Sequence, residues 1–130
     1  MAVVHHLGWA VRSIDESRVH FERALGLAFR GEEAFPDLRV AFFGEGPATV
    51  ELLEPLAENS DLSAFLAKHG EGLHHLALKV DDVAAALDDA NARGFRLLDT
   101  GPKPGARRTL IAFVDPKRAD GVLIQFVQES

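Results

Sequence analysis

Cysteine is absent from the 130-residue chain, which excludes disulfides, thiolate metal ligands and cysteine nucleophiles. Long apolar runs are also missing. None approaches the roughly 20 residues that cross a bilayer, so we expect no membrane partner. The first residues lack the basic start and cleavage site of a secretory signal, and we therefore expect a cytoplasmic protein. Basic residues are outnumbered, and the formal net charge of −6 argues against a general binder of nucleic acids.

The chain does contain an internal repeat. Residues 5–11 (HHLGWAV) resemble residues 74–80 (HHLALKV), and both segments predict a strand with alternating faces. A helix is predicted after each strand, over residues 13–25 with Ser13 as its N-cap and over residues 81–94. The repeat therefore predicts that one structural unit occurs twice in the chain.

Three strand candidates follow each predicted helix, bounded by glycine, proline and polar residues. They cover residues 27–33, 38–44 and 48–54 in the first half, and 95–99, 109–114 and 121–128 in the second. We therefore expect one α+β domain over residues 1–130, built from two tandem βαβββ modules with eight strands. The modules cover about residues 2–55 and 72–129, and the linker of residues 56–71 contains a short helix near residues 61–68.

Alternation along the repeated strand selects one histidine of each pair. Because successive side chains of a strand point to opposite faces, His6 shares a face with small residues, and so does His75. Small neighbours leave room, as the wall of a cavity would. The bulky apolar faces are expected to pack under the helices, and His5 and His74 would lie at the edge of these faces.

One polar residue interrupts the last predicted strand of each half. Glu51 and Gln125 stand between apolar neighbours, where an unpaired polar group costs a few kcal/mol. With His6 and His75 they could converge on a divalent metal such as Zn²⁺, Co²⁺, Ni²⁺ or Mn²⁺. The alternative is that each is an ordinary strand residue, a histidine with a local partner or a glutamate on a solvated face.

Several segments resemble the methylmalonyl-CoA epimerase family of the vicinal oxygen chelate superfamily, which includes glyoxalase I, extradiol dioxygenases and bleomycin resistance proteins. The resemblance covers nearly the whole chain and is carried by HHLGWAV, VELLEP, SAFLAKHGEGLHHLAL, GPKPGA and IAFVDPKRADGVLIQFVQ. It implies an open, metal-centred, eight-stranded barrel-like sheet and a homodimer. It also places the metal ligands on His6, Glu51, His75 and Gln125, the four residues that the repeat selects.

The sequence departs from this family at several positions. Gln125 stands where the family normally has a glutamate that is both ligand and base, and an amide is no base at neutral pH. Val40 aligns with a second glutamate of some members. In the loop before the seventh predicted strand, Arg107 and Arg108 replace a glycine-containing pair. Asp115, which precedes Pro116 and Lys117, replaces a common histidine.

The resemblance implies an epimerase that removes and returns the proton next to a thioester, with the metal stabilising the enolate. Its catalytic positions are Glu51 and Gln125, and only Glu51 can act as a base. Two alternatives stay open. One is another metalloenzyme of the superfamily, such as a glyoxalase I-like lyase, and the other is a non-catalytic protein that binds a small molecule. An extradiol dioxygenase is less favoured, because its iron needs a carboxylate at the position of Gln125.

Cations gather between residues 103 and 118, in an otherwise acidic chain. They are Lys103, Arg107, Arg108, Lys117 and Arg118. We expect Lys103, Arg107, Arg108 and Lys117 to bind an acyl-CoA substrate through its phosphates. Arg107 and Arg108 could instead clamp a substrate carboxylate, and solvated loops would show the same composition.

Overall fold

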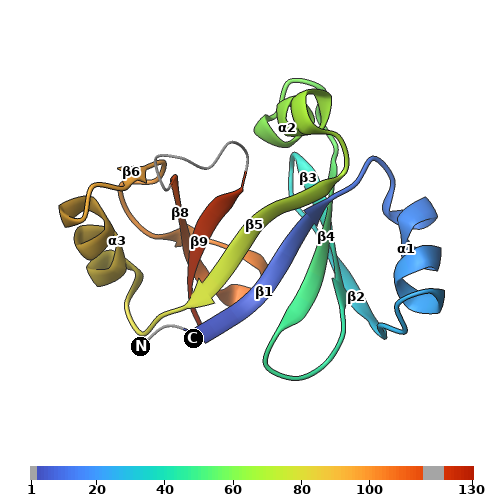
Figure 1. Ribbon diagram of the computed structural model, residues 1–130, viewed down its shortest axis with the longest axis horizontal. Helices are drawn as coiled ribbons and strands as arrows, with labels where there is room; N and C mark the ends of the chain where they lie inside the picture. The colour runs from blue at the N-terminus through green and yellow to red at the C-terminus, as the bar shows by residue number, and fades with distance from the viewer. Residues whose placement is uncertain (1–2, 116–121) are drawn as a thin grey trace. The chain divides into compact units, whose positions relative to one another are not determined.

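The computed structural model describes residues 3–115 and 122–130 (Figure 1). Within these residues it contains nine strands, three α-helices and one 3-10 helix. In chain order they are β1 (Val3–Ala10), α1 (Ile14–Arg23), β2 (Phe29–Ala34), β3 (Leu38–Phe43), β4 (Thr49–Pro55), α2 (Asp61–His69), β5 (Gly72–Lys79), α3 (Val83–Ala92), β6 (Arg96–Leu97), β7 (Lys103–Pro104), η1 (Ala106–Arg108), β8 (Leu110–Asp115) and β9 (Leu123–Gln128). No helix among the described residues is long and apolar enough to cross a membrane.

The chain divides into two compact units. We call residues 6–74 the first unit, and residues 3–5, 75–115 and 122–130 the second unit. Strand order is β2-β3-β4-β1 in one module of the fold and β5-β9-β8-β6 in the other, so each module has an open edge at β2 or β6. The predicted α+β class and the two βαβββ modules are confirmed.

The predicted number of eight strands is wrong for the described residues, which form nine. The additional strand is β7, where Lys103 pairs with Ile111 and Pro104 with Leu110. A two-residue strand with a proline gives no periodic pattern, and it exists only because the following turn folds it back onto β8. The strand predicted over residues 95–99 is shorter, since only Arg96–Leu97 pairs with β8.

The repeat extends to the register of the strands. β1 runs parallel to β4, with Gly8 opposite Glu51, and β5 runs parallel to β9, with Ala77 opposite Gln125. On the other side, Phe42 of β3 lies opposite Glu51, and Phe113 of β8 lies opposite Gln125. The two modules therefore place their polar strand residue in the same pairing environment.

Each helix begins at a side-chain cap, as the sequence predicts for α1. The hydroxyl of Ser13 accepts a hydrogen bond from the backbone N–H of Glu16 at 3.2 Å, and Asp82 accepts one from that of Ala85 at 3.1 Å. These side chains satisfy backbone donors that have no partner within the helix. Gly26, which follows α1, has a φ of +70°, a conformation that glycine adopts without steric cost.

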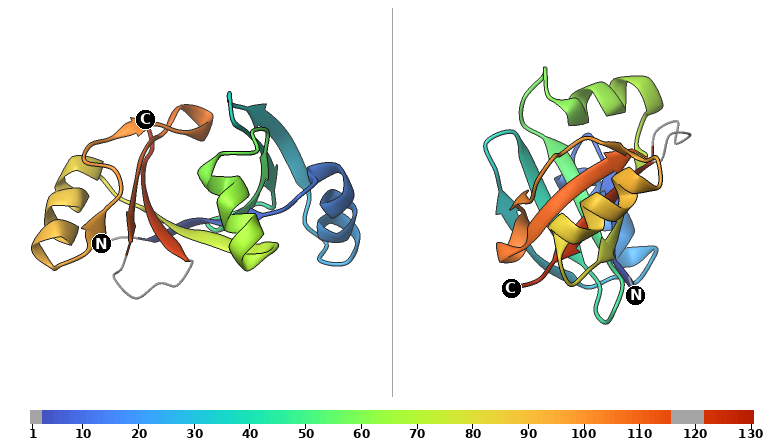
Figure 2. Two further views of the ribbon diagram at one scale, coloured as in Figure 1. Left: turned by 90° about the horizontal axis from the view of Figure 1, so that it is seen from above. Right: turned by 90° about the vertical axis from the view of Figure 1, so that its left-hand side faces the viewer.

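Each unit has its own apolar core under its helix. In the first unit α1 covers a cluster that includes Phe43 and Leu52, with Trp9 packed against it. In the second unit α3 lies over β8 and β9, and Val83 and Leu87 form its core with the strands (Figure 2). The position of Trp9 confirms that the bulky face of β1 packs toward the helix. The opposite face of β1 is then left for His6.

Candidate metal and acid–base site

The first unit brings His6 and Glu51 together. His6 lies on β1 and Glu51 on β4, and Nδ1 of the histidine is 3.3 Å from Oε2 of the carboxylate. Both residues are buried, with exposed fractions of 4% and 8%. Since Gly8 pairs with Glu51 and has no side chain, the strand register leaves space for the two groups to meet. The contact involves the histidine that alternation selects, and its role as a ligand stays a prediction.

The second unit repeats the placement with an amide. His75 on β5 and Gln125 on β9 are 3% and 6% exposed, and Ala77 takes the place of Gly8. The ring of Phe113 packs edge-on against His75, with ring centroids 5.3 Å apart. Within the described residues Oε1 of Gln125 has no hydrogen-bond partner. A buried carbonyl oxygen without a partner costs about 1–3 kcal/mol, so this atom is one that a ligand would satisfy.

The donors present suit a divalent metal ion. His5, His6 and Glu51 form a group whose ligand atoms all lie within 4.8 Å of one another, close enough to hold one ion. Within the second unit, His75 and the unpartnered Oε1 of Gln125 offer an imidazole and an oxygen of the same kinds. Nitrogen and oxygen donors of this kind fit Zn²⁺, Co²⁺, Ni²⁺ and Mn²⁺ alike, so the residues do not select among these ions.

The other histidine of each pair has a different environment. Nε2 of His5 lies 3.2 Å from Oε2 of Glu129, a carboxylate that also binds Lys79. His74 packs edge-on against Phe65 of α2, with ring centroids 4.8 Å apart. Burial lowers the pKa of His74 to about 4, although Asp61 acts in the opposite direction. His74 is therefore neutral at physiological pH and packs as an aromatic residue.

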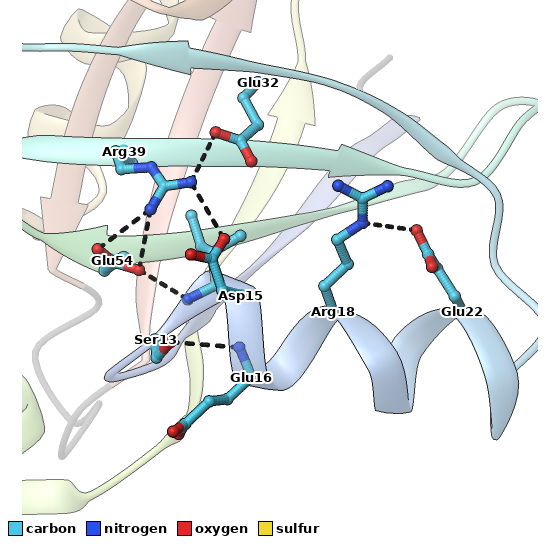
Figure 3. A network of polar contacts seen from close by, with 9 residues as sticks. Ser13, Asp15, Glu16, Arg18, Glu22, Glu32, Arg39 and Glu54 are labelled. Carbon is cyan, nitrogen blue, oxygen red and sulfur yellow. Dashed lines mark hydrogen bonds and ion pairs between the residues drawn. The ribbon is translucent and has the colours of Figure 1, made fainter.

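A carboxylate three residues after Glu51 holds the beginning of α1 (Figure 3). Oε1 of Glu54 accepts a hydrogen bond from the backbone N–H of Ile14 at 2.7 Å. Its carboxylate also lies 3.5 Å from Arg39, which binds Glu32 at 2.8 Å. The hydrogen bond with Glu32 is the largest cause of a raised pKa of Arg39, and the charges of Glu54 and Asp15 add to it.

An amide holds the corresponding helix of the second unit. Oε1 of Gln128 accepts a hydrogen bond from the backbone N–H of Val83 at 3.0 Å. Gln128 follows Gln125 as Glu54 follows Glu51, but its strand neighbour is Leu110 where Glu54 has Arg39. The sequence analysis did not predict these helix contacts. The available signal was the repeated three-residue spacing, from Glu51 to Glu54 and from Gln125 to Gln128.

The cationic segment forms a short hairpin with a strained turn. Its backbone φ is +55° at Arg107 and +61° at Arg108, although neither residue is glycine. The left-handed region costs such residues about 1–2 kcal/mol each. Both arginines are exposed, and Lys103 binds Asp99 at 3.1 Å. Lys117 and Arg118 lie outside the described residues.

Val40 is buried on the same face of β3 as Phe42, the residue opposite Glu51. A carboxylate at Val40 would share this face with Glu51, but valine supplies no base. Asp115, at the end of β8, binds Arg96 at 2.8 Å. The described site residues thus include one carboxylate beside a histidine, that of Glu51.

Comparison with known proteins places this arrangement in a family. Residues 5–113 match the model of the glyoxalase/bleomycin resistance protein/dioxygenase superfamily. An ethylmalonyl-CoA/methylmalonyl-CoA epimerase of Cereibacter sphaeroides is 32% identical over 129 residues, which are 96% of both chains. An uncharacterised Bacillus subtilis protein, YqjC, is 38% identical over 125 residues, which are 95% of this chain and 89% of that protein.

Among solved structures, a methylmalonyl-CoA epimerase in complex with methylmalonyl-CoA and NH4⁺ is 30% identical. Its TM-score is 0.89, and the match covers 98% of this chain and 94% of that one. Two βαβββ modules with buried histidines on their first strands define the fold class. The chain belongs to the glyoxalase/bleomycin resistance protein/dioxygenase superfamily, and its homologues include proteins named methylmalonyl-CoA epimerase.

Proposed function

We propose that the protein is a metal-dependent epimerase of methylmalonyl-CoA or a closely related acyl-CoA. The observation that carries the proposal is the buried contact of His6 with Glu51, in which a carboxylate lies beside a residue type that ligates metal ions. The names of the Cereibacter sphaeroides relative and of the solved complex support the acyl-CoA ligand. A homodimer and a cytoplasmic location remain predictions of the sequence.

We further propose that His6, Glu51, His75 and Gln125 are the ligands of one divalent ion. Such an ion would supply the positive charge that favours removal of the α-proton next to the thioester. The imidazoles and the amide oxygen bind as neutral donors, so Glu51 is the one anionic ligand of the set. Loss of the ion from both His6→Ala and His75→Ala, measured as metal per chain, would support the shared site. Retention in either variant contradicts it.

Glu51 is the residue that removes the α-proton from one face of the substrate carbon in this proposal. Gln125 occupies the equivalent position of the repeat but cannot accept a proton at neutral pH. The base and the amide have therefore exchanged modules relative to the family pattern. His6, at 3.3 Å, holds the Glu51 carboxylate in place. The opposite face of the substrate carbon then depends on water or on another group.

The decisive experiment incubates the metal-loaded protein with one epimer of methylmalonyl-CoA in D₂O. Deuterium uptake at the α-carbon and loss of chirality are followed together by NMR. Uptake with epimerisation supports the whole proposal. Uptake with retained chirality shows that Glu51 serves one face and that the opposite face has no acid, which contradicts epimerisation. No uptake by protein with measured bound metal rejects the proton-transfer role.

Because Gln125 is an amide and not a base, it favours a second candidate function, which is non-catalytic binding of a small molecule. Such a protein needs neither a metal nor a base, and would bind the acyl-CoA without exchanging its α-proton. Binding of methylmalonyl-CoA in the presence of a chelator, with no deuterium uptake after metal is restored, would identify this function. A glyoxalase I-like lyase is tested in parallel with a glutathione hemithioacetal, which the epimerase would leave unchanged.

A further inference from the structure

The edge strand β2 carries two neighbouring glutamates, which lie on opposite faces of the sheet in the first unit. Glu32 is opposite Ala41 of β3, and Glu33 is opposite Val40. Ala41 belongs to the apolar core that α1 covers, and the exposed Glu32 binds Arg39 at 2.8 Å on that side (Figure 3). Since successive residues of a strand alternate between faces, Glu33 lies on the face away from α1.

Glu33 therefore shares a face of the sheet with Glu51, the proposed base. Directly opposite residues of two antiparallel strands lie on the same face, and so do residues two apart along one strand. Val40 is opposite Glu33, and Phe42, two residues further along β3, is opposite Glu51. The register of β2, β3 and β4 thus directs both carboxylates to the face on which Glu51 meets His6.

The part of the sheet between the two glutamates is apolar. A row of paired residues leads from Glu33 across the sheet to Val40 and Leu53, which are 3% and 6% exposed. Glu33 is separated from Glu51 by about 10 Å across the strands and about 7 Å along them, because one strand and two residue steps lie between. Both side chains are long, so their carboxylates can approach one small group lying over Val40 from two directions.

The two carboxylates differ in their access to water. Glu51 is 8% exposed, whereas Glu33 is half-buried on β2, which is an open edge of the sheet. A group that donates a proton in each turnover must exchange protons with solvent, and a half-buried edge residue meets that need. Charges on an edge strand also discourage pairing with another chain, a role in which Glu32 and Glu33 would be equivalent.

We propose that Glu33 is the second acid–base residue and serves the face of the substrate carbon opposite to Glu51. The inference rests on the proposed epimerase and names the group on which its second face depends. For one epimer, the Glu51 carboxylate takes the α-proton, and the electrons of the C–H bond pass to the thioester as an enolate. Glu33, as a carboxylic acid, then gives its proton to the opposite face. The two carboxyl groups together hold one proton before and after the reaction, and the other epimer uses them in the reverse order.

The test compares Glu33→Gln with the wild type on each epimer of methylmalonyl-CoA separately, in D₂O, followed by NMR. We expect the variant to epimerise either epimer at least about a hundredfold more slowly. The epimer whose proton Glu51 removes should still take up deuterium with retained chirality, whereas the other epimer should take up none. The retained uptake shows, in the same sample, that the variant is folded and competent on one face.

The matched control is Glu32→Gln, which removes the same charge from the same strand on the opposite face. It should epimerise both epimers at the rate of the wild type. An equal loss in the two variants would overturn the assignment, because the charge of the edge strand and not its direction would then matter. So would a Glu33→Gln variant that loses deuterium uptake from both epimers, because Glu33 would then act through the structure as a whole.

Failure of the proposed function appears in the wild type, whereas failure of this assignment alone appears only in the variant. A wild type that takes up no deuterium from either epimer rejects the epimerase, and the role of Glu33 with it. A wild type that epimerises, together with a Glu33→Gln variant of equal rate, keeps the epimerase and rejects Glu33. Glu33→Asp, which keeps a carboxylate on a shorter side chain, should epimerise faster than Glu33→Gln, and equal rates of these two variants would contradict the proposal.

Discussion

The two modules share a backbone pattern but differ in the chemistry placed on it. Glu51 and Glu54 of β4 correspond in register to Gln125 and Gln128 of β9. Each first residue is buried near the repeated histidine strand, and each second residue accepts a hydrogen bond from the beginning of a helix. One module therefore uses carboxylates at both positions, and the other uses amides. The fold accommodates either kind of acceptor oxygen, so the difference between the modules lies in their chemistry.

The paired histidines show the same divergence. His6 and His75 are both buried at equivalent positions, whereas His5 binds Glu129 and His74 packs against Phe65. Both modules thus keep the buried histidine, His6 or His75. The other histidine of each pair has a different contact in each module.

The largest expected effect comes from exchanging the base. Glu51→Gln should lower the rate of α-proton exchange about a thousandfold, because it removes the carboxylate while leaving an oxygen ligand in place. Deuterium uptake measured by NMR, with metal content measured in the same samples, checks this. Gln125→Glu is the matched variant and should retain exchange. Full activity of a metal-loaded Glu51→Gln protein would show that Glu51 is not the base.

The second effect is a loss of folding stability at low pH that depends on His74. Its pKa is about 4 in the folded protein and about 6.5 in an unfolded chain, so the unfolded state binds more protons between these values. The free energy of unfolding should therefore fall by about 3 kcal/mol as pH decreases from 6.5 to 4. His74→Phe keeps a ring against Phe65 and should remove this part of the fall. Urea unfolding at several pH values, with chelator present, measures it, and an unchanged slope would refute it.

Smaller effects are expected at the two helix contacts. Glu54→Ala removes a charged partner of both Ile14 and Arg39, and we expect a loss of about 2 kcal/mol of unfolding free energy. Gln128→Ala removes one neutral hydrogen bond, and we expect about 1 kcal/mol. Chemical denaturation compares the two variants. Equal losses would show that the charge on Glu54 adds nothing at this position.

The smallest effects belong to the helix caps. Ser13→Ala and Asp82→Ala should each cost about 1 kcal/mol, because each leaves one backbone N–H without its partner. Only Asp82 adds a negative charge near the positive end of a helix. Raising the salt concentration should therefore shrink the loss for Asp82→Ala and leave that for Ser13→Ala unchanged. Thermal melts at low and high salt test the difference.

The elements and the buried site residues follow from local pattern. Period-two alternation selects His6 and His75, and an isolated polar residue in an apolar strand selects Glu51 and Gln125, because these signals depend only on neighbouring residues. The short strand β7 and the contact of Glu54 with Ile14 escape such reasoning. Both form because segments that are apart in the chain meet, and neither produces a periodic pattern of apolar residues in the sequence.

The ligand set as a whole and the binding role of Lys117 stay predictions. The strain at Arg107 and Arg108 could not be read from composition either, because residues with side chains seldom adopt a left-handed backbone. The sequence shows that two arginines stand there. The backbone angles show that this conformation has a cost in stability.

The parallel pairing of β1 with β4 has a consequence for folding kinetics. His6 and Glu51 are far apart along the chain, because a helix and two strands lie between them. Such pairings have a high contact order, and the entropy of closing the intervening loop is lost before any contact compensates for it. The polar pair is thus expected to form late on the folding pathway. A fragment ending before β4 would contain the histidine strand without any part of the acid–base chemistry.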